Sequence, residues 1–103
     1  MRLGEHQERF AEDYGKLLTW LHANGYSARL GDVLAEDGHK ENSQHYKKLA
    51  ADINLFYDGD FLTRTKDHKP LGDYWESLDP LNRWGGRYDD GNHYERMEEP
   101  WDS

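Results

Sequence analysis

Apolar side chains recur every three or four positions through residues 6–24, a spacing that predicts an amphipathic helix. The residues that would share its apolar face are Phe10, Tyr14, Leu17, Leu18 and Leu21. Asn24-Gly25 follows, a pair typical of helix C-termini because both residues tolerate the left-handed backbone conformation that ends a helix. We therefore expect this helix to pack on a sheet through one face.

The pattern changes over 49–56 to an alternation that puts Leu49, Ala51, Ile53 and Leu55 on one face, which predicts a strand. Asp52 and Asn54 would lie on one face of this strand, and its aliphatic residues on the other. Asp58-Gly59 then predicts a two-residue turn, after which residues 61–63 return as the second strand of a hairpin.

Three further segments complete the pattern. Residues 26–34 predict a strand after the first helix, and residues 70–78 predict a short helix that is entered through proline. Residues 93–96 predict a last strand, and the glycine-rich residues 84–92 are typical of irregular structure. The order predicts an α+β fold, in which a small antiparallel sheet carries helices on one face and, from the chemistry argued below, a zinc site on the other.

The composition limits what can stabilise such a fold. Apolar residues make up 35% of the 103-residue chain, below the roughly 45–50% of a soluble domain, although 14% of all residues are aromatic and bury a large area each. We expect one domain with a thin core over residues 1–97 and an acidic C-terminal tail over 98–103. Since the chain has no cysteine, disulfides and Cys-ligated zinc are excluded, and a metal with other ligands, or a partner, remains.

The charge narrows the classes of partner. The chain has 21 acidic and 13 basic residues, a net charge of −8, and Lys47-Lys48 is its one basic pair, so nucleic acid is not expected as a partner. No apolar run approaches the roughly 18 residues that span a bilayer, and the first six residues contain no signal-peptide core. These features predict a cytoplasmic, monomeric protein without a membrane anchor.

Two of the six histidines lie in a context that suggests metal binding, although a histidine is more commonly an ordinary surface residue. His45 lies seven residues before Asp52, whose carboxylate would project from a strand apolar enough to be central and so requires a partner. A continuous strand would place the two side chains on opposite faces, about 23 Å apart. They can meet only if the chain bends near residues 46–48, which places His45 in the loop before the strand.

Asp90 and His93 form the second half of the candidate site. A turn at Gly91-Asn92 would fold them toward each other, whereas an extended segment would separate them. His45, Asp52 and His93 would then be a complete ligand set for a catalytic zinc, which lowers the pKa of its bound water to roughly 7. Asp90 would accept the proton of that water and pass it to a leaving amine. The alternative is a solvated acidic turn with His93 at a sheet edge.

Four motifs follow one another in a specific order. Ser43-x-His45 is followed after six residues by Asp52, and further on come residues 68–78, the run 84–88 (Trp-Gly-Gly-Arg-Tyr) and Asp90-x-x-His93. In order and spacing these motifs resemble the D-alanyl-D-alanine carboxypeptidase family of zinc peptidases, in particular its small bacteriophage and prophage branch. That branch includes endolysins that cut the L-alanyl-D-glutamate bond of peptidoglycan.

The resemblance implies a zinc peptidase that acts on peptidoglycan stem peptides. It implies zinc ligation by His45, Asp52 and His93 and a catalytic base at Asp90, the same four residues that the spacing suggests. A lytic role of this kind would keep the protein in the cytoplasm until a separate membrane pore releases it to the cell wall. Two alternatives stay open: a D,D-carboxypeptidase of the same family, and a catalytically silent, zinc-stabilised binding or virion module.

The resemblance also implies residues that bind the substrate, but this chain lacks one that members of the family usually have. Ser43 would contact polar groups of the substrate, unless it is a turn residue, and Trp84 with the two glycines after it would form a wall close to the site. Members of the family usually carry an arginine in an Arg-Thr-Pro or Arg-Ser-Pro segment, where this chain has Ala35-Glu36-Asp37. Arg29 is the nearest substitute, unless it is a solvent-facing strand residue.

Overall fold

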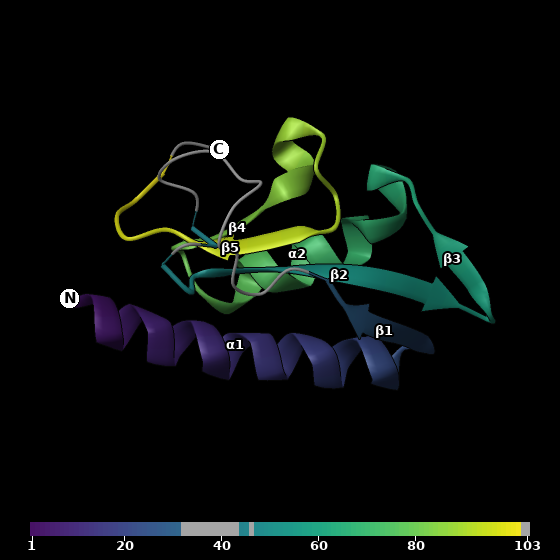
Figure 1. Cartoon of the computed structure of the whole chain (residues 1–103), viewed down its shortest axis with the longest axis horizontal. Helices are drawn as coiled ribbons and strands as arrows, with labels where there is room; N and C mark the ends of the chain where they lie inside the picture. The colour runs from purple at the N-terminus through teal and green to yellow at the C-terminus, as the bar shows by residue number, and fades with distance from the viewer. Residues whose placement is uncertain (32–43, 46, 102–103) are drawn as a thin grey trace.

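The computed structural model describes residues 1–31, 44–45 and 47–101, and Figure 1 shows how they are arranged. A long helix comes first, and an antiparallel sheet interrupted by a shorter helix follows. In chain order the elements are α1 (Leu3–Ala23), β1 (Tyr26–Leu30), β2 (Ala50–Tyr57), β3 (Asp60–Leu62), η1 (Thr65–His68), α2 (Lys69–Leu78), β4 (Asn82–Trp84), η2 (Gly85–Tyr88) and β5 (His93–Arg96). The predicted α+β fold with a small antiparallel sheet is confirmed.

Strand β2 is the centre of the sheet. β1 pairs with its residues 53–57 along one edge. Along the other edge, β5 pairs with residues 50–52 and β3 pairs with residues 55–57. β4 lies beyond β5. Ile53 and Asn54 therefore lie between the register pairs of β5 and those of β3, although Ile53 N–H still donates to the Asn92 carbonyl, just before β5, at 2.8 Å.

The hairpin between β2 and β3 forms as the sequence predicts. Tyr57 and Asp60 are register partners, which leaves Asp58 and Gly59 as the two turn residues. Their φ angles are 52° and 84°, the left-handed values that a two-residue turn matching the twist of the strands requires. Gly59 adopts such an angle without steric cost, and aspartate tolerates it better than most residues.

The core lies between one face of the sheet and the two α-helices (Figure 1). The predicted inward face of β2 is buried, and Phe10 of α1 meets Trp75 of α2 edge-on at 5.5 Å between ring centroids. The fully buried apolar core residues are Leu17, Leu21, Leu49, Ala50, Ala51, Ile53, Leu55, Leu71, Trp75 and Tyr94. Aromatic rings thus supply much of the volume that a chain with few aliphatic residues lacks.

Several element boundaries differ from the sequence-based prediction. α1 begins at Leu3, before the apolar repeat starts, because the Glu5 carboxylate accepts a hydrogen bond from the Arg2 backbone N–H at 3.0 Å and caps the first turn. Residues 84–92, predicted to be irregular, contain the end of β4 and the short helix η2. β1 is described to Leu30, and the rest of the predicted strand over 26–34 lies largely outside the described residues.

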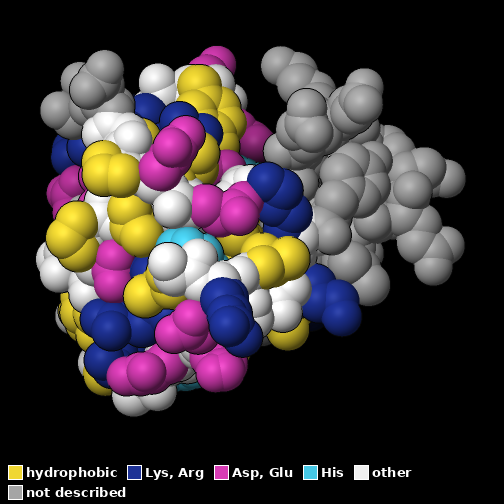
Figure 2. All heavy atoms as spheres, turned by 90° about the vertical axis from the view of Figure 1, so that its left-hand side faces the viewer, with side chains coloured by type: hydrophobic (Ala, Val, Ile, Leu, Met, Phe, Trp, Pro, Cys, Tyr) yellow, Lys and Arg dark blue, Asp and Glu magenta, His cyan; other side chains and the backbone are white. Residues whose placement is uncertain are grey.

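The surface mixes both signs of charge. Acidic and basic side chains alternate over the face shown in Figure 2. Several charged side chains of the described residues are paired, as Lys47 is with Glu98 and Arg87 with Glu76. Near the C-terminus, Trp101 is half-buried, with the Arg87 guanidinium 4.8 Å from its ring centroid. None of the helices in the described part of the chain has the length and apolar character needed to cross a membrane.

Candidate metal centre

Three donor atoms from His45, Asp52 and His93 converge on one point. His45 Nε2 lies 3.2 Å from Asp52 Oδ1 and 3.1 Å from His93 Nδ1, and the third side of the triangle is also 3.1 Å. Three corners of a tetrahedron with bonds of about 2.0–2.1 Å lie about 3.3 Å apart, so the spacing suits zinc. A single N–H on His93 Nδ1 cannot point at both other atoms, whereas a cation between them attracts all three. The residues therefore fit a metal ion.

The sheet register brings two of these ligands together. Asp52 of β2 and His93 of β5 are direct partners. The Asp52 carbonyl accepts a hydrogen bond from Gly31 N–H at 2.8 Å, so the backbone groups of Asp52 point toward β1 and away from β5. Asp52 and His93 are therefore a non-hydrogen-bonded pair. In such pairs the two Cα atoms are closest and the side chains adjoin. By strand alternation, both side chains lie on the face opposite Ala51, Ile53 and Leu55 of β2.

The third ligand arrives through a bend in the chain. Leu49 N–H donates to the Gln44 carbonyl at 2.8 Å, and Lys48 adopts a left-handed φ of 60°. The predicted bend before the strand is thus confirmed, and it turns His45 back over β2. The His45 side chain is 1% exposed, His93 is 8% exposed and Asp52 is 19% exposed. The carboxylate side of the triangle is therefore its most accessible side.

Glu95 is a residue of the site that the sequence pattern did not reveal. Its Oε1 lies 2.8 Å from His93 Nε2, and its other oxygen pairs with Arg83. A carboxylate at Nε2 holds the proton there, which leaves Nδ1 with a lone pair for a metal. The signal for it was present, because Glu95 lies two residues after His93 on a strand and so must share its face.

The electrostatics of the site favour a positive charge. Burial lowers the pKa of His93, but the hydrogen bonds and negative charges of Asp52 and Glu95 outweigh it and raise that pKa to about 9. An imidazole between two carboxylates retains a proton in neutral solution unless a metal ion replaces it. The same surroundings would stabilise a divalent cation.

Asp90 adjoins this centre through the predicted turn. His93 N–H donates to the Asp90 carbonyl at 3.1 Å, which confirms that residues 90–93 fold back. The chain at Gly85 passes so close that a Cβ there would lie 2.3 Å from the Asp90 carbonyl oxygen. Burial raises the pKa of Asp90; the neighbouring His93 opposes this and the charge of Asp52 adds to it. A carboxylate with a raised pKa is better suited to carry a proton near neutral pH.

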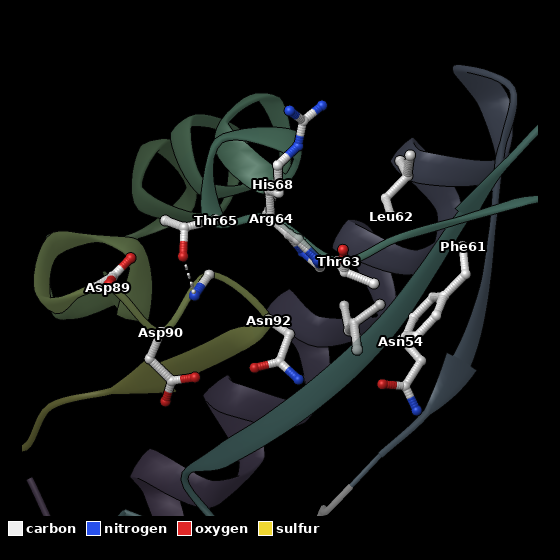
Figure 3. A pocket seen from close by; sticks show the side chains of 12 residues that line it. Asn54, Phe61, Leu62, Thr63, Arg64, Thr65, His68, Asp89, Asp90 and Asn92 are labelled. Carbon is white, nitrogen blue, oxygen red and sulfur yellow. Dashed lines mark hydrogen bonds between the residues drawn. The ribbon is translucent and has the colours of Figure 1, made fainter.

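A cavity of about 230 Å³ extends from Asp90 to the hairpin (Figure 3). Asp90 and Asn92 stand along one side of it, and Asn54 and Phe61 along the other. It lies where the register pairs of β5 with β2 end and those of β3 with β2 have not yet begun, beside Ile53 and Asn54. Asp90 and Asn92, which line the cavity, belong to the turn that leads into the candidate ligand His93, so the cavity adjoins this turn.

The three remaining predicted site residues have different positions. Trp84 belongs to the core: its indole N–H donates to the Gly91 carbonyl at 2.7 Å, so it supports the turn before His93 from behind. Arg29 lies on the same sheet face as Asp52, but its guanidinium is 4.7 Å from the ring centroid of Phe56, toward the far end of β2. Ser43 lies outside the described residues.

No protein-family model, curated protein or solved structure matches the chain.

Proposed function

We propose that the protein is a zinc-dependent peptidase that cleaves the stem peptide of bacterial peptidoglycan, as an endopeptidase of the L-alanyl-D-glutamate type. The observation that carries the proposal is the triangle of donor atoms 3.1–3.2 Å apart, with Asp90 one turn away from His93. The resemblance of the four motifs to the D-alanyl-D-alanine carboxypeptidase family supports the choice of substrate.

In this proposal each residue of the site has a distinct role. Zinc held by His45, Asp52 and His93 would supply Lewis-acid activation of water and of the peptide carbonyl. Asp90 takes the proton from the attacking water as the new C–O bond forms, and returns it to the amine as the C–N bond breaks. Glu95 keeps His93 in the tautomer that presents Nδ1, and Arg83 holds Glu95 in turn.

The test is cleavage of defined stem peptides by purified protein loaded with one equivalent of zinc, with and without a chelator. We expect chelator-sensitive cleavage and a new D-glutamate amino terminus by mass spectrometry. Release of the terminal D-alanine instead would identify a D,D-carboxypeptidase. An absence of cleavage despite bound zinc would contradict the enzymatic proposal and leave a silent zinc-stabilised module.

The variant Asp90→Asn separates catalysis from structure. Its amide cannot accept the proton of water at neutral pH, so turnover should fall by about 10²-fold or more. Zinc content and melting temperature should stay near those of the unmodified protein, because Asp90 is not one of the three ligands. Asp89→Asn, at the exposed neighbouring position, is the matched control. Equal activity in the two variants would remove Asp90 from the mechanism.

A further inference from the structure

Two phenylalanines form an exposed aromatic surface at the hairpin end of the sheet. Phe56 of β2 and Phe61 of β3 are register partners, and their rings stack with centroids 5.1 Å apart and planes 26° apart. Phe61 is 54% exposed. The Arg29 guanidinium covers Phe56. β1 and β3 flank β2, so Phe56 is half-buried between the Arg29 guanidinium and the Phe61 ring, and the outer side of Phe61 is the exposed part of the pair. An aromatic ring backed in this way by a second ring is a preformed binding surface rather than a scattered apolar residue.

This surface is continuous with the candidate metal centre. One face of β2 carries Asp52, Asn54 and Phe56 in turn. The aromatic pair therefore lies four residues, or about 13 Å, along the strand from the ligand Asp52. Phe61 also lines the cavity that contains Asp90, and Figure 3 shows Asn54 beside it. A ligand that extends from the metal centre through this cavity reaches the two rings.

We propose that the Phe56–Phe61 pair binds a pyranose ring of the glycan strand to which the stem peptide is attached. This inference rests on the proposed function. The first alanine of the stem is joined through a lactyl group to the sugar, and two such units of extended chain span about 7 Å. The glycan therefore begins within the roughly 13 Å that separate the metal centre from the rings.

The chemistry of the neighbouring side chains favours a sugar over an apolar partner. One face of a pyranose carries only C–H groups, which pack on the negative face of an aromatic ring, while its hydroxyl and acetamido groups point outward. Asn54, Thr63 and Arg29 adjoin the two rings with an amide, a hydroxyl and a guanidinium. A lipid surface or a second copy of the chain would instead require a wider apolar area without this polar rim.

Binding is tested by titrating the labelled protein with a soluble tetramer of β-1,4-linked N-acetylglucosamine, followed by NMR. We expect saturable shifts of the backbone amides of Phe61 and Asn54. Phe61→Ala should weaken the affinity about tenfold, the scale of one lost aromatic contact. Tyr57→Ala is the matched control, because Tyr57 is 50% exposed on the same hairpin but points to the opposite face.

In the sugar titration itself, three results would overturn the inference: no saturable shifts, shifts confined to other residues, or equal weakening by the two alanine variants. Shifts that appear only with phospholipid vesicles, or with rising protein concentration, would assign the rings to a membrane or to self-association and would also overturn it. The sugar titration requires no turnover, so it decides whether the rings bind a sugar even if the proposed peptidase activity is absent.

A kinetic comparison then connects the surface to the reaction. The unmodified protein should cleave a disaccharide-linked stem peptide with a higher kcat/KM than the free peptide. This ratio should fall toward one in Phe61→Ala and persist in Tyr57→Ala. A ratio near one in the unmodified protein would contradict the inference while leaving the peptidase proposal intact, whereas cleavage of neither substrate would contradict the peptidase proposal alone.

Discussion

Asp52 and His93 are register partners on adjacent antiparallel strands, with Asp52 Oδ1 3.1 Å from His93 Nδ1. Two of the three candidate ligands are therefore brought together by the backbone pairing of β2 and β5, 41 residues apart in the chain. Since this pairing exists only in the folded protein, the free energy of metal binding adds to the free energy of folding. The third ligand, His45, extends the same coupling to the bend before β2.

Zinc should consequently stabilise the protein, and Asp52→Ala should abolish the effect. Zinc at about 100 times its dissociation constant adds about 2.7 kcal/mol to the free energy of unfolding, a rise of roughly 10 °C or more in melting temperature for a domain of this size. Scanning calorimetry with and without a chelator measures it. Asp73→Ala, at an exposed position of α2, should retain the full zinc effect. An undiminished zinc effect in Asp52→Ala would show that the ligand set is different.

Glu95→Gln should weaken zinc binding without removing a ligand. The neutral amide accepts less strongly from the N–H of His93 Nε2, and it leaves Arg83 without its charged partner. Changes to groups that orient a ligand histidine typically cost about 10- to 100-fold in metal affinity. Competition with a chromophoric chelator measures the dissociation constant. Glu99→Gln removes the same charge at an exposed position and should bind zinc like the unmodified protein.

The main elements of the fold could be predicted because their signals are local. The helical repeat, the alternation over 49–56 and the Asp58-Gly59 turn each need only neighbouring residues to be recognised. β4 could not be predicted in this way. Its residues Asn82 and Arg83 show no apolar alternation, and the strand exists because it pairs with β5 across the irregular segment 85–92, a pairing that no local pattern announces.

The candidate site could likewise be predicted only in part. The meeting of His45 with Asp52 followed from an argument about strand parity, which required a bend between them, and the bend is present. The position of Trp84 did not follow, because its motif says nothing about which face of a three-residue strand is buried. Glu95 was missed for a related reason: its role depends on His93 being a ligand, and only the folded structure shows the 2.8 Å contact between them.

Gly72→Ala should destabilise the protein strongly. A Cβ at this position of α2 would lie 2.2 Å from the Trp84 ring, so the indole or the helix must move. Overpacking of this kind costs about 1–3 kcal/mol. Displacing the indole would also weaken its 2.7 Å hydrogen bond to the Gly91 carbonyl and loosen the turn before His93. We therefore expect lower zinc affinity as well as a lower melting temperature.

Gly15→Ala is the control for Gly72→Ala, because it makes the same chemical change at a position where we expect a gain in stability. Gly15 lies on the exposed side of α1, and nothing is within 4 Å of a Cβ placed there. Alanine in the interior of a helix is about 0.8–1.0 kcal/mol more favourable than glycine. Urea unfolding should show a gain in stability for Gly15→Ala and a loss for Gly72→Ala. A loss at both positions would contradict the packing argument.

His68 should make the folded state sensitive to acid. It is buried at the start of α2, with Nδ1 2.8 Å from the Tyr94 hydroxyl, and burial lowers the pKa of His68 below its ordinary 6.5, although Asp67 and the Leu62 backbone oppose this. In the unfolded chain the imidazole takes up a proton as the pH falls through 6.5, whereas in the folded protein it does so only at lower pH. The stability present above pH 6.5 is therefore lost as the pH falls through this interval.

The comparison that isolates this effect is the difference in unfolding free energy between the unmodified protein and His68→Asn, measured in urea at pH 7.5 and at pH 5.0. Asparagine places an oxygen near the position of Nδ1 and cannot titrate. A chelator is present throughout, so that the protonation of His45 and His93 contributes equally to both proteins and cancels. The advantage of the unmodified protein should shrink at pH 5.0, and by more than the corresponding change for His22→Asn at the exposed end of α1. An advantage that stays constant in acid would show that folding leaves the proton affinity of His68 unchanged and would contradict the prediction. An advantage that grows in acid would show that the folded state favours the protonated imidazole, which would place a positive charge at the wall of the cavity beside Asp90.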